Sequence, residues 1–199
     1  MPRLSELNAI YLYDAPLTVL VDLFLQILEG VEYLHSWQIA HLDLCTGNIL
    51  AAVDKDAVHD KRIEAGKIYL IDFQMSRQLR LPPGQQPAIL LPETQVRPPG
   101  GIKHFDPYSW DVYCLGDVFQ RRLKKYCFMR PGEPWIIRRY IRWLTGTERG
   151  CMASCHCRPT ARRARQVLTM IRWVVSVSMG LERLATLFIS VFNWHAIAE

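Results

Sequence analysis

The chain has 199 residues, half of them apolar, a size that suits one ordinary hydrophobic core with room for a small second lobe. A formal charge of +5 and a pI near 9.0 are only mildly basic, so a dedicated nucleic-acid binder is not expected. Three of the six cysteines are clustered and three are scattered, and residues 1–8 mix charge, proline and polar residues instead of forming an apolar leader. The composition therefore favours an intracellular protein with reduced thiols.

The first predicted element is a helix from Leu17 to His35, because its apolar residues recur at helical spacing and form one stripe. Asn48–Val53 and Lys67–Ile71 are short apolar segments that predict two strands. Acidic and basic residues alternate in Asp54–Gly66, so this segment predicts a solvated loop between the strands.

The second half of the chain begins with a long predicted loop. Leu81–Gly101 contains six of the twelve prolines, which excludes a regular helix there. Helices are expected after Trp110, around residues 136–144, and from Ala161 to Trp173. This order of elements predicts a mainly α fold with a small β element.

The C-terminal residues 171–199 predict an apolar helix or a tail. Trp173–Phe192 is long enough to cross a bilayer by length alone. Glu182 and Arg183 fall in its middle, however, and such residues cost roughly 2.5–3.5 kcal/mol each at the centre of a membrane helix. No membrane span is therefore predicted.

Three polar residues in two short segments are the main candidates for catalysis and metal binding. The segment from His41 to Asn48 reads HLDLCTGN, and Asp72-Phe73 follows the second predicted strand. Phosphoryl transfer needs a group that accepts the proton of the attacking hydroxyl, and oxygens that hold a metal ion opposite it. Asp43 is the candidate base, and Asn48 and Asp72 are the candidate magnesium ligands.

These segments resemble motifs of the protein kinase superfamily. HLDLCTGN is similar to the catalytic loop H-R-D-L-x-x-x-N, with Leu42 in place of arginine, and Asp72-Phe73-Gln74 is similar to D-F-G. Asp111 to Gly116 resembles the start of the large central helix, and Arg158-Pro159-Thr160 resembles the element that opens a late helix. The resemblance runs from about residue 22 to 168 and implies the C-lobe of a divergent, fungal-like eukaryotic protein kinase domain.

The resemblance also implies a role for each matched residue. Asp43 and Asn48 would be catalytic, Asn48 and Asp72 would bind ATP through Mg, and four further residues would be structural: His41, Phe73, Asp111 and Arg158. In the family, the counterpart of Asp111 braces the catalytic loop through backbone N–H groups.

The counterpart of Arg158 pairs in the family with the glutamate of an A-P-E motif. At the matching place this chain reads Arg97-Pro98-Pro99-Gly100, so that glutamate is missing and Glu93 is at best a displaced substitute.

Other departures from the family concern the phosphate-binding parts. No G-x-G-x-x-G occurs, and the forty residues before His41 contain no lysine. Cys45 stands where serine/threonine kinases usually carry a phosphate-contacting lysine. Residues 1–16 are therefore expected to be a lead-in near the connection between lobes, and residues 17–170 a kinase-like C-lobe that lacks the N-lobe.

The expected function is ATP-dependent phosphoryl transfer to a protein hydroxyl, of serine/threonine type, weak or absent in this truncated chain. The alternative is a non-catalytic pseudokinase that binds a protein partner through its helical lobe. Three other readings are less favoured: a nucleophilic Cys45, a zinc site at Cys151–Cys157, whose spacing lacks paired C-x-x-C motifs, and nucleic-acid binding by the basic segment 121–165.

Overall fold

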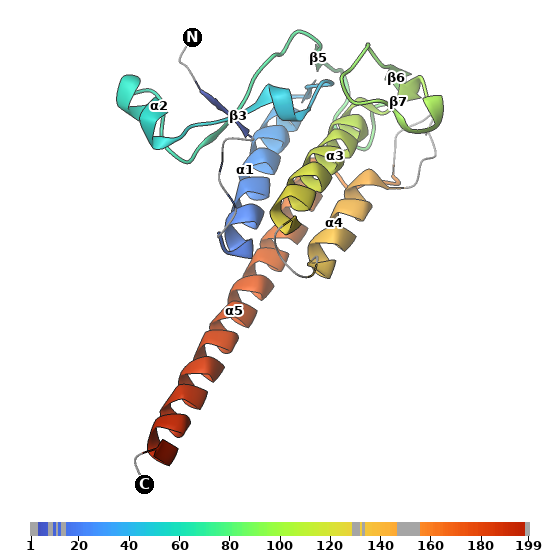
Figure 1. The fold of residues 1–199 in the computed structure, drawn as a ribbon. Coiled ribbons are helices and arrows are strands. Elements are labelled where there is room, and N and C mark those ends of the chain that lie inside the picture. The colour runs from blue at the N-terminus through green and yellow to red at the C-terminus, as the bar shows by residue number, and fades with distance from the viewer. Residues whose placement is uncertain are drawn as a thin grey trace.

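The computed structural model describes residues 4–7, 10, 12, 15–128, 132, 134–146 and 156–197, with their side chains except those of 59 and 187–197. Within this part the fold is mainly helical with small sheets, which confirms the predicted fold class at that level. Short strands and loops gather at one end of the packed helices, and the last helix extends far beyond the other end (Figure 1).

Helix α1 (Leu17–Ser36) runs beside helix α5 (Ala161–Ile197). Asp22 of α1 accepts a hydrogen bond from Nε of Arg172 at 2.9 Å, and Glu32, further along α1, pairs with Arg165. The later residue of α1 thus meets the earlier residue of α5, so the two helices are antiparallel. The helix predicted at Leu17–His35 is confirmed.

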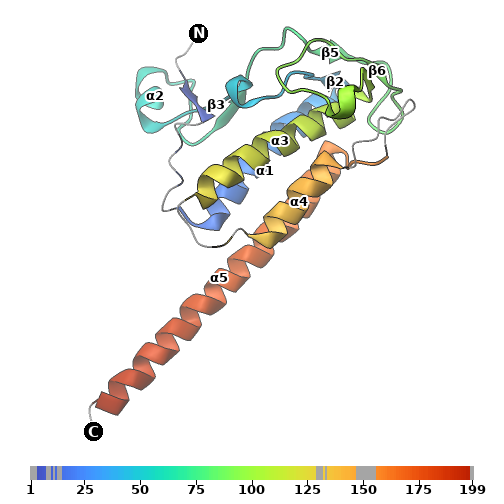
Figure 2. The same cartoon turned by 45° about the vertical axis from the view of Figure 1, so that its right-hand side comes forward.

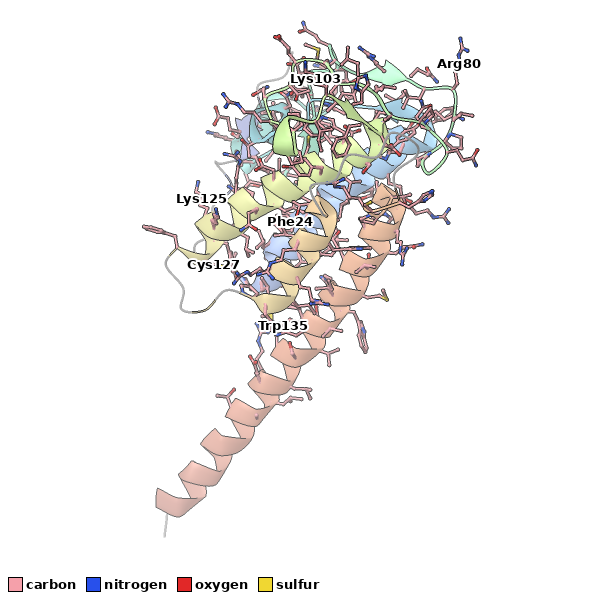
Figure 3. The ribbon with its side chains drawn as sticks, turned by 90° about the vertical axis from the view of Figure 1, so that its right-hand side faces the viewer. Phe24, Arg80, Lys103, Lys125, Cys127 and Trp135 are labelled. Atoms are coloured by element: carbon pink, nitrogen blue, oxygen red, sulfur yellow. The ribbon has the colours of Figure 1, made fainter. Side chains whose placement is uncertain are left out.

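The hydrophobic core lies between α1 and helix α3 (Pro107–Cys127). The rings of Phe24 and Phe119 stack with centroids 3.9 Å apart and an interplanar angle of 9°. Figure 3 shows Phe24 among the helices, whereas Arg80 and Lys103 lie at the end that carries the strands and loops. The apolar stripe of α1 is therefore the face that packs into the core.

Helix α3 begins earlier than the sequence analysis expected. Its first residue is Pro107, and the side chain of Asp106 caps it by accepting hydrogen bonds from the backbone N–H groups of Tyr108 (2.9 Å) and Ser109 (3.1 Å). An aspartate followed by proline is a favourable helix start, because proline needs no partner for an N–H and its φ suits the first turn. The prediction of a helix only after Trp110 was wrong by one turn.

Helix α4 (Trp135–Thr145) packs against α3 and contacts α5 (Figure 2). Gly116 allows the close approach to α3, because a Cβ at this position would lie 2.7 Å from Cγ2 of Thr145 and 3.3 Å from Cβ of Leu144. The helix predicted around residues 136–144 is confirmed.

The predicted pair of strands is present as β3 (Ile49–Ala51) and β4 (Ile68–Leu70), antiparallel with Leu50 opposite Tyr69. A third strand, β1 (Ser5–Glu6), pairs with the other edge of β3 and was not predicted. Two residues are too few for a period-2 pattern to be recognised.

The prediction of a loop over Asp54–Gly66 was wrong for its first part, because Asp54–His59 form helix α2. Oδ2 of Asp56 accepts a hydrogen bond from the backbone N–H of Val53 at 3.1 Å and so satisfies a donor at the helix start. Two carboxylates in the first turn also suit the positive end of the helix dipole.

Two further strand pairs hold the loops at this end. Strand β2 (Ile39–Ala40) pairs with β5 (Arg77–Gln78), and β6 (Ile89–Leu90) pairs with β7 (His104–Phe105), both antiparallel. The long segment 81–101 contains β6 and a single 3-10 turn at Pro99–Gly101, and no α-helix, as predicted.

Helix α5 continues without a break from Ala161 through the C-terminal segment for which a helix or a tail was predicted. The hydroxyl of Thr160 accepts a hydrogen bond from the N–H of Arg163 and caps its start. Among the described helices, none is both long and apolar enough to traverse a bilayer. The far half of α5 stands clear of the other elements (Figure 1). Along α5 as a whole, several apolar side chains are exposed, among them Trp173, Val177, Leu181 and Leu184.

Candidate active site

The loop from His41 to Asn48 connects β2 with β3 and ends in a 3-10 turn at Thr46–Asn48. The carboxylate of Asp111, which is fully buried in α3, accepts hydrogen bonds from the backbone N–H groups of His41 (Oδ2, 2.8 Å) and Leu42 (Oδ1, 2.8 Å). One side chain of the central helix thus holds two consecutive amides of the loop.

Leu42 adopts a left-handed backbone conformation with φ of 69°, which is unfavourable for a bulky residue. Three contacts hold it there. Its N–H binds Asp111, its carbonyl accepts a hydrogen bond from the indole N–H of Trp110 at 2.9 Å, and its side chain is fully buried. These contacts fix the direction in which the next residue, Asp43, leaves the loop.

His35, near the end of α1, is a third partner of Asp111. Its Nε2 lies 3.0 Å from Oδ2 of Asp111, and its Nδ1 is buried without a hydrogen bond. This arrangement assigns the proton to Nε2, because a bare Nδ1 is easier to bury than an unpaired N–H. Asp111 therefore joins α1, α3 and the loop.

The Asp43 carboxylate is almost covered, with 8% of the residue exposed. Nδ2 of Asn48 donates to the carbonyl oxygen of Asp43 (2.8 Å) and to its Oδ2 (3.1 Å). Gln95, from the long segment 81–101, donates its backbone N–H to Oδ1 (2.9 Å) and its side-chain amide to Oδ2 (3.2 Å). Asp43 and Asn48, both predicted as site residues, are thus in direct contact.

Asp72 is brought to the same place by the β3–β4 pair. The N–H of Ile71 donates to the carbonyl of Asn48 at 3.0 Å, so the residue after Ile71 emerges beside the loop. Asp72 is exposed and has φ of 62°, a second left-handed non-glycine position. Strained positions of this kind cluster at functional sites.

The residues fit a magnesium ion in two respects. Because both hydrogen bonds of Asn48 use Nδ2, its Oδ1 is left as an oxygen ligand, and within the described part of the chain the Asp72 carboxylate has no hydrogen-bond or ion-pair partner. Magnesium prefers oxygen ligands and usually takes only one or two protein groups beside water and phosphate. Asn48 and Asp72 could therefore hold Mg together with ATP phosphates.

His41 and Phe73 contact each other and the strand end that carries Asp72. Nε2 of His41 lies 3.0 Å from the carbonyl oxygen of Ile71, and its ring lies 4.9 Å from the ring of Phe73. The hydroxyl of Ser76 donates to the carbonyl of His41 at 3.2 Å. Phe73 remains 47% exposed, so one of its faces is available to a further contact.

Arg158 lies away from these residues, under the segment that precedes α3. Its Nε donates to the carbonyl of Thr145 at 2.7 Å, and its guanidinium lies over the rings of Phe105 (4.8 Å) and Tyr113 (5.3 Å). Glu93 is exposed and forms no ion pair within the described residues. Aromatic rings thus line the position of Arg158.

Cys45 does not favour nucleophilic chemistry. Burial raises the pKa of its thiol, and the charges of Asp43 and Asp72 add to the effect, although backbone hydrogen bonds from Asn48 and Gly47 act in the opposite direction. A thiol with a raised pKa holds little of the reactive thiolate. Most of the Cys151–Cys157 cluster lies outside the described residues.

Sequence reasoning missed three residues of the site: His35, Gln95 and Trp110. His35 and Trp110 carried a weak signal, because each is a polar-tipped side chain on the apolar face of a helix. Gln95 carried none, since it lies 52 residues from Asp43 in a segment without periodicity.

Comparison with known proteins gives a partial likeness. No family model matches the chain. Over 99 residues, 47% of the chain, it is 32% identical to Serine/threonine-protein kinase PLK4 of Nematostella vectensis. The match covers 9% of that kinase, so the chain corresponds to a small part of the relative's length. About half of this chain is thus similar in sequence to part of a serine/threonine kinase, which supports a kinase-like relation.

Proposed function

We propose that this chain is a kinase-like lobe that holds a protein hydroxyl at Asp43 and magnesium-bound ATP at Asn48 and Asp72, and that the chain alone transfers phosphate weakly or not at all. One observation carries the proposal: the strained loop holds the buried Asp43 carboxylate against Asn48, and the hydrogen bond from Ile71 to Asn48 brings the chain at Asp72 beside the end of that loop. The partial likeness to a serine/threonine kinase supports it.

In this proposal Asp43 would orient the acceptor hydroxyl and take its proton, while the hydroxyl oxygen would bond to the γ-phosphorus of ATP and the bond from that phosphorus to the bridging oxygen would break, so that ADP leaves. Asn48 fixes the Asp43 carboxylate through Nδ2, and Asp111 fixes the loop backbone that carries both. Magnesium-bound ATP, when present, would supply the phosphoryl group. Positioned cations usually stabilise the charge that develops on the phosphoryl oxygens.

We expect the reaction to be weak because this sequence has no lysine at the positions where lysines would contact the phosphates. Cys45 occupies the position of the usual phosphate-contacting lysine, and the first lysine of the sequence is Lys55. Lys55 lies in the first turn of α2, between β3 and β4, and not on a strand. The chain therefore supplies the acceptor side of the reaction more completely than the donor side.

Two measurements test the proposal. Thermal unfolding with magnesium and ATP should show stabilisation, which reaches about 2.7 kcal/mol at a hundredfold excess over the dissociation constant. The variants Asp72→Ala and Asn48→Ala should lose this response, and Asp117→Ala, on the outer side of α3, should keep it. Phosphate transfer to casein should stay near the background of Asp43→Asn, and robust Asp43-dependent turnover would contradict the proposed weakness.

A non-catalytic interaction module is the second candidate. The exposed apolar residues of α5, such as Trp173 (67% exposed) and Leu181 (61%), favour it, because an unpaired apolar face on a projecting helix suits a protein partner. A flat response to magnesium and ATP would support this candidate over the first.

A further inference from the structure

The hydrogen bonds of the Asp43 carboxylate leave little room for a substrate. A carboxylate has about four acceptor positions. Three are occupied: Gln95 donates from its backbone to Oδ1 and from its side chain to Oδ2, and Asn48 donates to Oδ2. An acceptor hydroxyl that approaches Oδ2 meets the side-chain amide of Gln95.

The backbone at Gln95 is anchored on both sides. Before it, the β6–β7 pair is extended by a hydrogen bond from the N–H of Leu91 to the carbonyl of Lys103 at 2.9 Å. After it, the side chain of Val96 is part of the core, and the hydroxyl of Thr94 donates to the carbonyl of Val96 at 2.7 Å. The backbone N–H that binds Oδ1 is therefore held in place.

The side chain of Gln95 is not anchored in the same way. Gln95 is an exposed residue, and its amide reaches across the 3-10 turn, with Oε1 4.0 Å from where a Cβ at Gly47 would be. A glutamine side chain can change rotamer into solvent without disturbing the core. The two donors of Gln95 thus differ in mobility, and the mobile one covers Oδ2.

We propose that the Gln95 side chain is a cover on Oδ2 of the Asp43 carboxylate, and that a serine or threonine hydroxyl must displace it to reach this oxygen. The requirement for displacement rests on the proposed function, whereas the cover itself is a property of the fold. The backbone N–H of Gln95 stays on Oδ1 and keeps the carboxylate oriented. The segment 81–101 then acts as an autoinhibitory element through a single side chain.

The test measures access to Asp43 without requiring catalysis. The full chain is treated at one fixed pH with a water-soluble carbodiimide and glycine ethyl ester, and amide formation at each carboxylate is followed by peptide mass spectrometry. Exposed Asp72 is the internal reference. In Gln95→Ala, Asp43 should be labelled about 10- to 100-fold faster than in the wild type, the change expected from losing one hydrogen bond to a charged acceptor. Gln95→Met, which keeps the side-chain length but has no hydrogen-bond donor, should behave likewise.

Gln85→Ala is the matched control, because Gln85 is exposed in the same segment and its side chain makes no hydrogen bond within the described residues. Unchanged labelling of Asp43 in both Gln95 variants, with helical circular dichroism intact, would overturn the cover. Thermal stabilisation by magnesium and ATP is measured on the same proteins. Faster labelling of Asp43 without such stabilisation in any variant refutes the proposed function and leaves the cover standing. Stabilisation by magnesium and ATP with unchanged labelling of Asp43 refutes the cover and leaves the proposed function standing.

Discussion

Replacing Asp111 with alanine removes the shared acceptor of three buried donors. The backbone N–H groups of His41 and Leu42 and Nε2 of His35 all bind its carboxylate at 2.8–3.0 Å. In the alanine variant these donors stay buried, and water can reach them only if the loop moves away from α3.

The size of the effect follows from the number of donors. A buried donor without a partner costs about 1–3 kcal/mol, so three give roughly 3–9 kcal/mol by simple addition. Contacts within one network are not additive, and breaking a buried charged contact usually costs about 3–5 kcal/mol. We expect a loss of that order, a large share of the roughly 5–15 kcal/mol that stabilises a typical domain.

Urea unfolding followed by circular dichroism measures this loss. Asp117→Ala is the matched control on the same helix, because Asp117 forms a partly exposed ion pair with Arg121 at an i, i+4 spacing and should lose only about 0.3–0.5 kcal/mol. If Asp111→Ala does not fold, Asp111→Asn and His35→Ala provide graded versions of the same perturbation. A loss below about 1 kcal/mol for Asp111→Ala would refute the idea that this carboxylate holds the loop.

Three further predictions concern single positions. Gly116→Ala should lower the free energy of unfolding by about 1–3 kcal/mol, because the new Cβ would meet α4. Gly180→Ala, with open space around the new Cβ, should raise it by about 0.5–1 kcal/mol. Urea midpoints of the two variants that shift in the same direction would contradict this prediction. Leu42→Gly should be at least as stable as Leu42→Ala, since the positive φ reverses the usual order of the two residues; a clearly less stable glycine variant would mean that the conformation is unstrained. Burial raises the pKa of Cys114 well above 9.0, so the unfolded chain loses this proton first and the free energy of unfolding should fall as the pH rises through about 9. Cys114→Ala should flatten that fall above about pH 9, and an equally steep fall in the variant would exclude the thiol as its source.

The sequence predicted those parts of the fold that rest on repeated local patterns. The apolar spacing of residues 17–35 was enough to define α1, and the paired apolar segments were enough to define β3 and β4. Prolines were enough to exclude a helix from 81–101. The helix α2 was missed because acidic residues suit both a solvated loop and a helix N-terminus, and only the hydrogen bond of Asp56 distinguishes the two.

The candidate site was predictable to the extent that its residues are close along the chain. Asp43 and Asn48 lie five residues apart, and the strand pairing that brings Asp72 to them could be read from the sequence. Gln95 was not predictable, because its contact depends on how a proline-rich segment crosses the loop. The positive φ of Leu42 was also not predictable from the sequence, because leucine rarely adopts a left-handed backbone conformation.

The way in which Asp111 is connected has a consequence for larger assemblies. All the contacts described above that shape the loop come from residues 35–111. The chain thus holds the loop with its own side chains and backbone, and we expect the loop to keep its shape beside different neighbours.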